Sequence, residues 1–253
     1  MRFVILASGS KGNSIFIETD YTRLLIDAGI SANKISEKLE SFEIEPRTID
    51  AIVLTHSHTD HVRGVGRFST RYGIPIYAHP ETLDSITILL KQNQKLVPWY
   101  RDFQIKDIRL KPFKLSHDCE PTFGYLIEDN YKSLAICTDL GIATNNVKKI
   151  LQHSNSIILE SNHDTDMLIN GRYPYYLKER IASRVGHLSN YEAGNLLREV
   201  MHSGIEQVIL GHLSDENNNP QIALETVLSI NEWQIESLLG VISQDQSSPI
   251  FQL

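Results

Sequence analysis

A run of seven residues with the sequence THSHTDH, at positions 55–61, constrains this chain more than any other feature. It holds three histidines and one aspartate, and it follows the apolar run AIVL at positions 51–54. Continuous Val, Ile and Leu predict a short buried strand, and the polar residues then form the loop that leaves its carboxyl end. Imidazoles and a carboxylate suit zinc, iron or manganese, so the run indicates a metal site.

The spacing within positions 55–61 indicates two ions rather than one. Alternation along an extended chain lets His56 and His58 point the same way, which supplies two ligands to one ion. Asp60 and His61 fall where the chain turns, so we expect them to hold a second ion about 3.5–4 Å from the first. A lone His-x-His pair is weak evidence, whereas the full H-x-H-x-D-H pattern after a strand is specific. A polar surface loop is the alternative interpretation.

This motif resembles the metal-binding signature of the metallo-β-lactamase superfamily, and further segments follow in the order of that family. The resemblance implies that four side chains bind the first ion: His56, His58, His117 and Asp139. It implies that four side chains bind the second ion, with Asp139 shared: Asp60, His61, Asp139 and His212. Asp60 is also expected to take part in catalysis. Asp27 resembles the aspartate that braces the metal loop without binding metal.

Residue patterns support two of these positions independently of the family. Residues 132–138 and 206–210 are apolar and β-prone, so Asp139 and His212 are each expected at the carboxyl end of a strand. Taken alone, His117 or His212 is more often an ordinary polar residue at the end of a strand. The cluster at 55–61 makes ligation the better interpretation.

The resemblance covers nearly the whole chain and implies an α+β fold, the αββα sandwich in which two mixed β-sheets are flanked by helices. The chain has 253 residues, which fits a single domain over 1–253, and no linker or repeat divides it. Strands are expected at 2–7, 13–19 and 22–27. Helices are expected at 80–91, 144–152, 174–185, 190–202 and 220–230. The segment from 247 onward is expected to be a closing edge or a tail.

The segment GHLSNYE at 186–192 discriminates between candidate reactions. Ser189 and Glu192 predict a capping box, which places His187 just before a helix N-terminus, where backbone N–H groups favour an anion. A histidine there that binds no metal can donate a proton to the departing alkoxide of a phosphodiester. His187 resembles the proton donor of tRNase Z-like nucleases, and Glu160 resembles the glutamate that orients it. Packing at the helix cap is the alternative role for His187.

Four segments, at 7–14, 160–164, 171–174 and 186–190, together resemble the YycJ/WalJ branch of the superfamily. This resemblance implies a DNA exonuclease that acts from the 5′ end. The hypothesis is therefore a dinuclear metal-dependent phosphodiesterase that attacks DNA with a hydroxide held between two divalent ions. Zinc is the first expectation for these ions, with manganese or iron as alternatives. The oligomeric state is left open.

Six residues near these segments are candidate substrate contacts: Ser10, Lys11, Asn13, Asn162, His163 and Arg172. The Gly-rich turn at 9–14 lacks the spacing of a P-loop, so a simple hairpin is its default. The formal net charge of −7 argues against a general polyanion binder. Local positive charge is expected from a group near His187, with a solvated surface as the alternative: Arg172, Lys178, Arg180 and Arg184.

Two other functions stay open. The first is acyl hydrolysis, as in glyoxalase II-like thioesterases or a promiscuous β-lactamase, although Asp139 in place of a ligating cysteine fits nucleases and glyoxalases better than zinc β-lactamases. The second is a metal protein without catalysis. The two cysteines predict no disulfide framework, and no signal-peptide pattern or membrane span is visible. A cytoplasmic protein is therefore expected.

Overall fold

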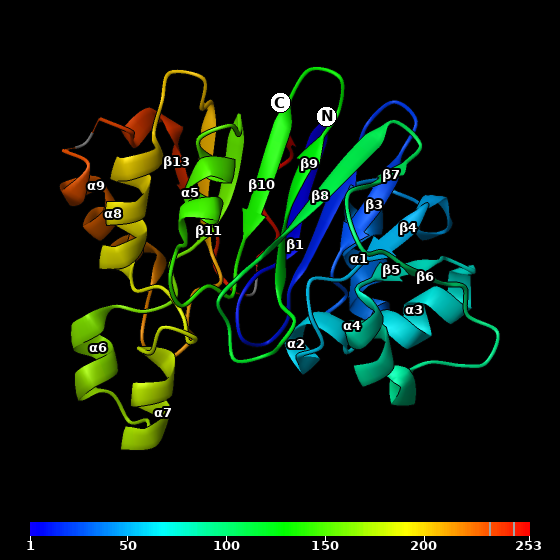
Figure 1. The fold of residues 1–253 in the computed structure, drawn as a ribbon, viewed down its shortest axis with the longest axis horizontal. Helices are drawn as coiled ribbons and strands as arrows, with labels where there is room; N and C mark the ends of the chain where they lie inside the picture. The colour runs from blue at the N-terminus through cyan, green and yellow to red at the C-terminus, as the bar shows by residue number, and fades with distance from the viewer. Residues whose placement is uncertain (233, 245) are drawn as a thin grey trace.

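Two β-sheets face each other between two layers of helices (Figure 1) in the computed structural model, which describes residues 1–232, 234–244 and 246–253. Within these residues the first sheet contains, in spatial order, β14 (Phe251–Gln252), β1 (Arg2–Ala7), β2 (Ser14–Glu18), β3 (Arg23–Ile26), β4 (Ala51–Val53), β5 (Ile76–Ala78) and β6 (Leu96–Pro98). The second contains β13 (Leu239–Val241), β12 (Gln207–Gly211), β11 (Ser156–Glu160), β10 (Ser133–Cys137), β9 (Phe123–Glu128), β8 (Ile108–Lys114) and β7 (Phe103–Ile105). Each sheet combines antiparallel and parallel pairs. The predicted αββα sandwich is confirmed.

Helices cover the outer face of each sheet. On the first sheet these are α1 (Ala32–Ser41) and α3 (Val65–Tyr72), and on the second they are α5 (Asn145–Leu151), α8 (Asn190–Val200) and α9 (Pro220–Ile230). Shorter helical segments are α2 (Thr59–Val62), α4 (Pro80–Ser85), α6 (Thr165–Asn170), α7 (Tyr175–Ile181) and the 3-10 turns η1 (Pro46–Thr48), η2 (Thr87–Leu89) and η3 (Glu236–Leu238). Among the described residues, no helix is both long enough and apolar enough to cross a membrane.

Side chains alternate along β1 between two apolar layers, which shows that this strand is buried on both faces. Phe3 and Ile5 point into the layer between the two sheets, whereas Val4 and Leu6 pack against the helices outside. A strand covered on both faces needs apolar residues at every position, which is why β1 reads as a continuous apolar run.

The predicted strands at 2–7, 13–19 and 22–27 agree with β1, β2 and β3 to within one residue. The last residues form a closing edge, because Phe251 of β14 pairs with Phe3 of β1. The helices expected at 144–152, 190–202 and 220–230 are α5, α8 and α9, while the one expected at 174–185 ends earlier, at Ile181. Helices α1 and α3 were not expected from the sequence.

The helix expected at 80–91 is wrong in its second half, because α4 ends at Ser85 and a 3-10 turn follows. The hydroxyl groups of Ser85 and Thr87 hydrogen-bond to carbonyl oxygens three or four residues earlier. Ile86 and Ile88 are β-branched, as is Thr87. Crowded β-branched side chains and competing hydroxyl hydrogen bonds both weaken a helix.

Candidate metal centre

Asp27 holds the loop that follows β4. It lies just after β3, the parallel neighbour of β4, and its Oδ1 accepts a hydrogen bond from the backbone N–H of Thr55 at 2.8 Å. Its Oδ2 lies 2.8 Å from Thr55 Oγ1 and 2.7 Å from Nδ1 of His61. With Nδ1 donating to Asp27, the lone pair of His61 is on Nε2, which faces Asp60 and Asp139.

Three other buried histidines have a polar partner at Nδ1 as well, so their Nε2 atoms are left for the centre. The partners are Thr55 Oγ1 at 2.9 Å for His56, the carbonyl oxygen of Gly186 at 3.1 Å for His117, and Glu160 Oε1 at 2.7 Å for His212. Hydrogen bonds of this kind fix the tautomer and orientation of metal-binding histidines.

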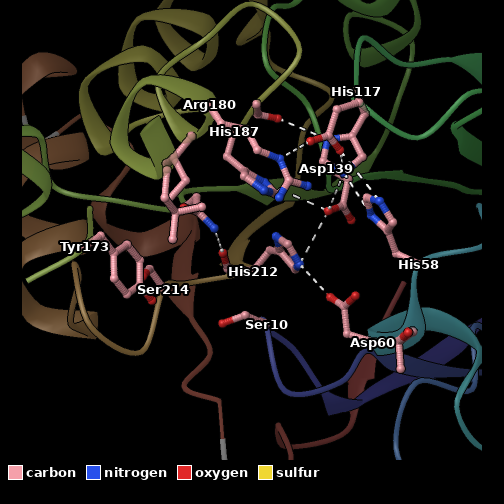
Figure 2. A pocket seen from close by; sticks show the side chains of 16 residues that line it. Ser10, His58, Asp60, His117, Asp139, Tyr173, Arg180, His187, His212 and Ser214 are labelled. Atoms are coloured by element: carbon pink, nitrogen blue, oxygen red, sulfur yellow. Dashed lines mark hydrogen bonds and ion pairs between the residues drawn. The ribbon is translucent and has the colours of Figure 1, made fainter. Parts of the chain in front are cut away.

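The side chains expected to bind metal come together in two groups near Asp139, and Figure 2 shows His58 and His117 of the first group and Asp60 and His212 of the second around that carboxylate. The ligand atoms of the first group, His56, His58 and His117, lie within 4.8 Å of one another, as do those of the second group, Asp60, His61 and His212. Asp139 Oδ2 lies 3.1 Å from His61 Nε2, and its Oδ1 lies 3.5 Å from His117 Nε2 and 3.6 Å from His212 Nε2. Asp139 therefore lies where one carboxylate can reach both groups.

Backbone strain marks three residues at the carboxyl edges of the sheets. Asp27, Asp139 and His212 have φ values of 61°, 62° and 55°, in the left-handed region that non-glycine residues seldom adopt. Each follows a strand, β3, β10 or β12, so the unusual turn directs its side chain toward the same rim. Strain of this kind costs about 1–3 kcal/mol per residue and clusters at functional sites.

The charges around His61 and His212 favour cations, whereas burial and neighbouring imidazoles lower the pKa values of His56 and His58. Burial alone would raise the pKa of Asp139, but the neighbouring His212 and His61 hold it well below its usual value. Burial would lower the pKa of His212, but Asp139 and the other carboxylates raise it to about 10. A potential that draws protons onto imidazole nitrogens also attracts divalent cations, which compete with protons for the same lone pairs.

Buried ligand atoms without hydrogen-bond partners provide a second test of whether these residues fit metal ions. Among the described residues, His56 Nε2, Asp139 Oδ2 and His212 Nε2 are buried and make no hydrogen bond. Buried polar atoms seldom lack a partner, and these three belong to Asp139 and to one histidine of each ligand group. Imidazole nitrogens together with carboxylate oxygens are the ligand set of zinc, manganese and iron. The residues therefore fit divalent metal ions.

Glu160, at the end of β11, is a fully buried carboxylate that organises the side of the centre facing α8. Its Oε1 accepts hydrogen bonds from Nδ1 of His187 at 2.8 Å and Nδ1 of His212 at 2.7 Å. Its Oε2 accepts from the backbone N–H groups of Leu140 at 2.9 Å and Leu188 at 3.1 Å. Although burial raises the pKa of Glu160, His187 and His212 lower it to about 2. Glu160 is thus an anion whose oxygens are already used.

His187 lies beside the candidate ligand groups and lines the cavity in front of them (Figure 2). Burial lowers its pKa, but the adjacent Glu160 more than offsets this and raises the pKa above its usual value. The predicted capping box is present, with Ser189 and Glu192 bonding to each other's backbone N–H groups at the start of α8. His187 therefore stands two residues before the N-cap, with a carboxylate behind it and the cavity in front.

A cavity of about 390 Å³ opens in front of the centre. Of the six expected substrate contacts, two line this cavity and four do not. Ser10 and Asn162 line it. Lys11 points elsewhere, with its Nζ 2.8 Å from Asp215. Arg172 is exposed and lies outside the cavity wall.

Asn13 and His163 are also away from the cavity wall. The amide of Asn13 bonds to the backbone of Gly9 and lies 2.9 Å from Nε2 of His61, so it supports the turn at 9–14 and a ligand. His163 is 3% exposed and its backbone pairs with Ser189, so it is a buried residue and not one at the surface.

Several residues of the cavity wall were not singled out from the sequence. Leu177 and Ile181 of α7 and the preceding Tyr173 are three of them, and Asp118 is a fourth. Asp118 Oδ1 lies 3.6 Å from Nε2 of His58. The apolar spacing of Leu177 and Ile181 was a usable signal, because such a pair four residues apart shares one helix face. That spacing does not say whether the face covers the core or a cavity.

Residues 22–213 match the sequence family described as the β-lactamase superfamily domain. The chain belongs to the metallo-β-lactamase superfamily. Exodeoxyribonuclease YycJ of Bacillus anthracis is 34% identical over 236 residues, which cover 92% of this chain and 89% of that protein. Exodeoxyribonuclease WalJ of Streptococcus pneumoniae serotype 2 is 35% identical over 235 residues, which cover 90% of this chain and 87% of that protein. The likeness of the motifs to this branch of the superfamily is confirmed.

A solved structure gives the same picture of the fold. Zn²⁺-bound PqqB of Methylobacterium extorquens superposes with a TM-score of 0.72 and 18% identity, covering 98% of this chain and 100% of that one. At this identity the likeness concerns the fold alone.

Asp27→Asn is expected to weaken metal binding by about 10- to 100-fold, the usual effect of losing a hydrogen-bond partner behind a metal-binding histidine. One amide oxygen cannot replace two carboxylate oxygens that accept from Thr55 and His61. Competition with a zinc chelator measures the affinity. Asp102→Asn, at an exposed ion pair with Arg109, is the control. Wild-type affinity in Asp27→Asn would remove the bracing role from Asp27.

Proposed function

We propose that this protein is a dinuclear metal-dependent phosphodiesterase that removes nucleotides from DNA as an exodeoxyribonuclease. His56, His58 and His117 would hold one ion, Asp60, His61 and His212 the other, and Asp139 both. Zinc is the proposed metal, with manganese or iron as alternatives, because all three accept this mixture of imidazole and carboxylate ligands. Bound ions of this kind activate water for attack and stabilise the charge that develops on the phosphoryl group.

The observation that carries the proposal is the pairing of His187 with Glu160 beside the ligand groups. With Nδ1 bonded to Glu160, the Nε2 of His187 is free to hold a proton toward the cavity. Glu160 stabilises the protonated ring, which is why the pKa of His187 is raised. The leaving group of a nucleic acid is an alkoxide, which departs far more readily when a positioned acid protonates it. We therefore assign proton donation to His187 and its orientation to Glu160.

Other residues of the wall have proposed roles in binding. Asp60 lines the cavity as well as contacting His61 and His212, so we assign it a role in orienting the attacking water besides metal binding. Ser10 and Asn162 line the cavity, so we assign them hydrogen bonds to phosphate oxygens, which for Asn162 leaves the other amide N–H in its bond to the carbonyl oxygen of His212.

The choice of DNA rests on similarity to named relatives rather than on the ligands, and the 5′ end is carried over from the resemblance of the segments at 7–14, 160–164, 171–174 and 186–190. Two relatives that cover about nine tenths of this chain are named exodeoxyribonucleases. A metal centre by itself attacks phosphodiesters, thioesters and lactams alike, so relatives and wall residues must select among them. His187 favours the phosphodiester, because acyl transfer to water from a thioester releases a thiolate that needs less help from an acid.

Hydrolysis by purified, metal-quantified protein tests the proposed function. The substrates are single- and double-stranded DNA labelled at either end, single-stranded RNA, a thioester and a chromogenic β-lactam, each with added Zn²⁺ or Mn²⁺. Metal-dependent release of mononucleotides from DNA, beginning at the 5′ end, is the expected result. Intact nucleic acid together with fast acyl hydrolysis would contradict the proposal and leave His187 as a structural residue at the cap of α8.

A further inference from the structure

Helix α7 presents an apolar face that the core of the fold does not use. None of its seven residues, all of them described, is buried. Leu177 and Ile181 are four residues apart and so share one face, and both line the cavity in front of the metal centre. Tyr173, just before the helix, lines it too. An amphipathic helix on a globular protein normally buries its apolar stripe against the core, whereas here the stripe faces the place where a substrate binds.

Arg180 adds a positive charge to the same face. Its Nε donates a hydrogen bond to Oδ2 of Asp118, which holds the guanidinium at the cavity wall. The two terminal amino groups of Arg180 make no hydrogen bond within the described part of the chain. A guanidinium has five N–H donors in a fixed fork that matches phosphate oxygens. Asp118 therefore orients Arg180 while leaving four of its N–H donors for a ligand.

The position of Tyr173 and Arg180 and the volume of the cavity limit the size of a ligand that can bind there. Figure 2 shows Tyr173 and Arg180 on one side of the cavity, Asp60 on the opposite side, and His187 and His212 between them. A volume of about 390 Å³ is at the lower end of the range for small-molecule pockets. One nucleotide fits such a space, but a stacked base pair with both backbones does not.

We propose that Tyr173 and Arg180 form a subsite for the terminal nucleotide of a single DNA strand. The ring of Tyr173 stacks on the base, Leu177 and Ile181 complete the apolar wall, and Arg180 binds a backbone phosphate. Stacking on an aromatic ring tolerates every base, as an exonuclease that proceeds along a strand requires. The inference rests on the proposed function and deepens it, because it selects an unpaired end over a duplex end.

Binding of an oligonucleotide tests the subsite apart from turnover. Metal-loaded protein is titrated into a ten-nucleotide oligothymidylate that carries phosphorothioate linkages at both ends and an internal fluorophore, at several salt concentrations. Each phosphate contact on a single strand contributes about 0.7 to the slope of log Kd against log salt. Arg180→Gln is expected to raise Kd about tenfold and to reduce this slope by about 0.7. Arg180→Lys is expected to keep the slope.

Tyr173→Leu is expected to raise Kd by about tenfold with an unchanged salt slope, since stacking releases no counterions. Tyr173→Phe is expected to bind like the wild type. Two controls lie away from the cavity. Arg109→Gln removes an arginine that is 56% exposed and paired with a carboxylate, as Arg180 is, and Tyr131→Leu removes an 88% exposed tyrosine. Thermal unfolding shows whether each variant is folded.

Several outcomes separate this subsite from the proposed function. The subsite is overturned when Arg180→Gln matches Arg109→Gln in Kd and slope, or when a blunt duplex binds as tightly as the single strand. It is also overturned when unmodified DNA is hydrolysed with wild-type KM by both Arg180→Gln and Tyr173→Leu. A wild-type protein that binds the single strand through these residues but cleaves no DNA supports the subsite and contradicts the nuclease instead.

Discussion

Asp139→Ala is expected to lose bound metal and hydrolysis together, with nucleotide release falling to background. Asp139 Oδ2 faces His61 while Oδ1 faces His117 and His212, so both ligand groups depend on this one carboxylate. Without it, the first group would hold only neutral imidazoles, and Asp60 would be the one carboxylate left among the proposed ligands to balance two divalent charges. Metal content by atomic emission and release of labelled nucleotides, measured on the same preparation, test this result.

Backbone strain requires a second variant at this position. Asp139 has a φ of 62°, and alanine tolerates that conformation less well than asparagine does. Asp139→Asn therefore keeps the backbone and removes the charge, and it should lose metal and activity as Asp139→Ala does. Asp102→Ala, an exposed aspartate, is the control. Full activity in Asp139→Asn would contradict a shared carboxylate.

His187→Ala is expected to keep the metal and to slow cleavage of DNA by about 100-fold or more, the size of a lost general acid. His187 bonds to Glu160, whose oxygens also hold His212 and two backbone N–H groups, so the ligand groups retain their own support when His187 is removed. Single-turnover cleavage rates and metal content, measured together, separate the two effects.

His202→Ala, at an exposed histidine just after α8, is the matched control for the substitution and should change neither quantity. A fall in metal content in His187→Ala would mean that His187 is a ligand. The assignment of proton donation would then be wrong.

The metal loop could be predicted because its chemistry is local. Ligands within six residues after a buried strand can be recognised without knowing where the rest of the chain lies, as at His56 and Asp60. The capping box at Ser189 is local in the same sense, since each partner lies three residues from the other. The metal loop and the capping box could therefore be predicted without knowledge of any tertiary contact.

Contacts between segments that are distant in the sequence could not be predicted from local patterns. The carbonyl oxygen of Gly186 orients His117 across 69 residues of sequence, and Glu160 serves His212 across 52. The periodicity of α7 predicted a helix but not its orientation, because an apolar face looks the same whether it covers a core or a cavity. Asn13 carries no sign that its amide supports a turn and a ligand rather than a substrate.

The dependence of the cleavage rate on the leaving group tests the central claim most directly. Cleavage rates of wild type and His187→Ala are compared on an oligonucleotide, whose alkoxide needs a proton, and on thymidine p-nitrophenyl phosphate, whose leaving group does not. With metal content equal in both proteins, we predict a loss of about 100-fold or more on the oligonucleotide and of only a few-fold on the nitrophenyl ester. Equal losses on both substrates would contradict a metal-dependent phosphodiesterase in which His187 is the proton donor.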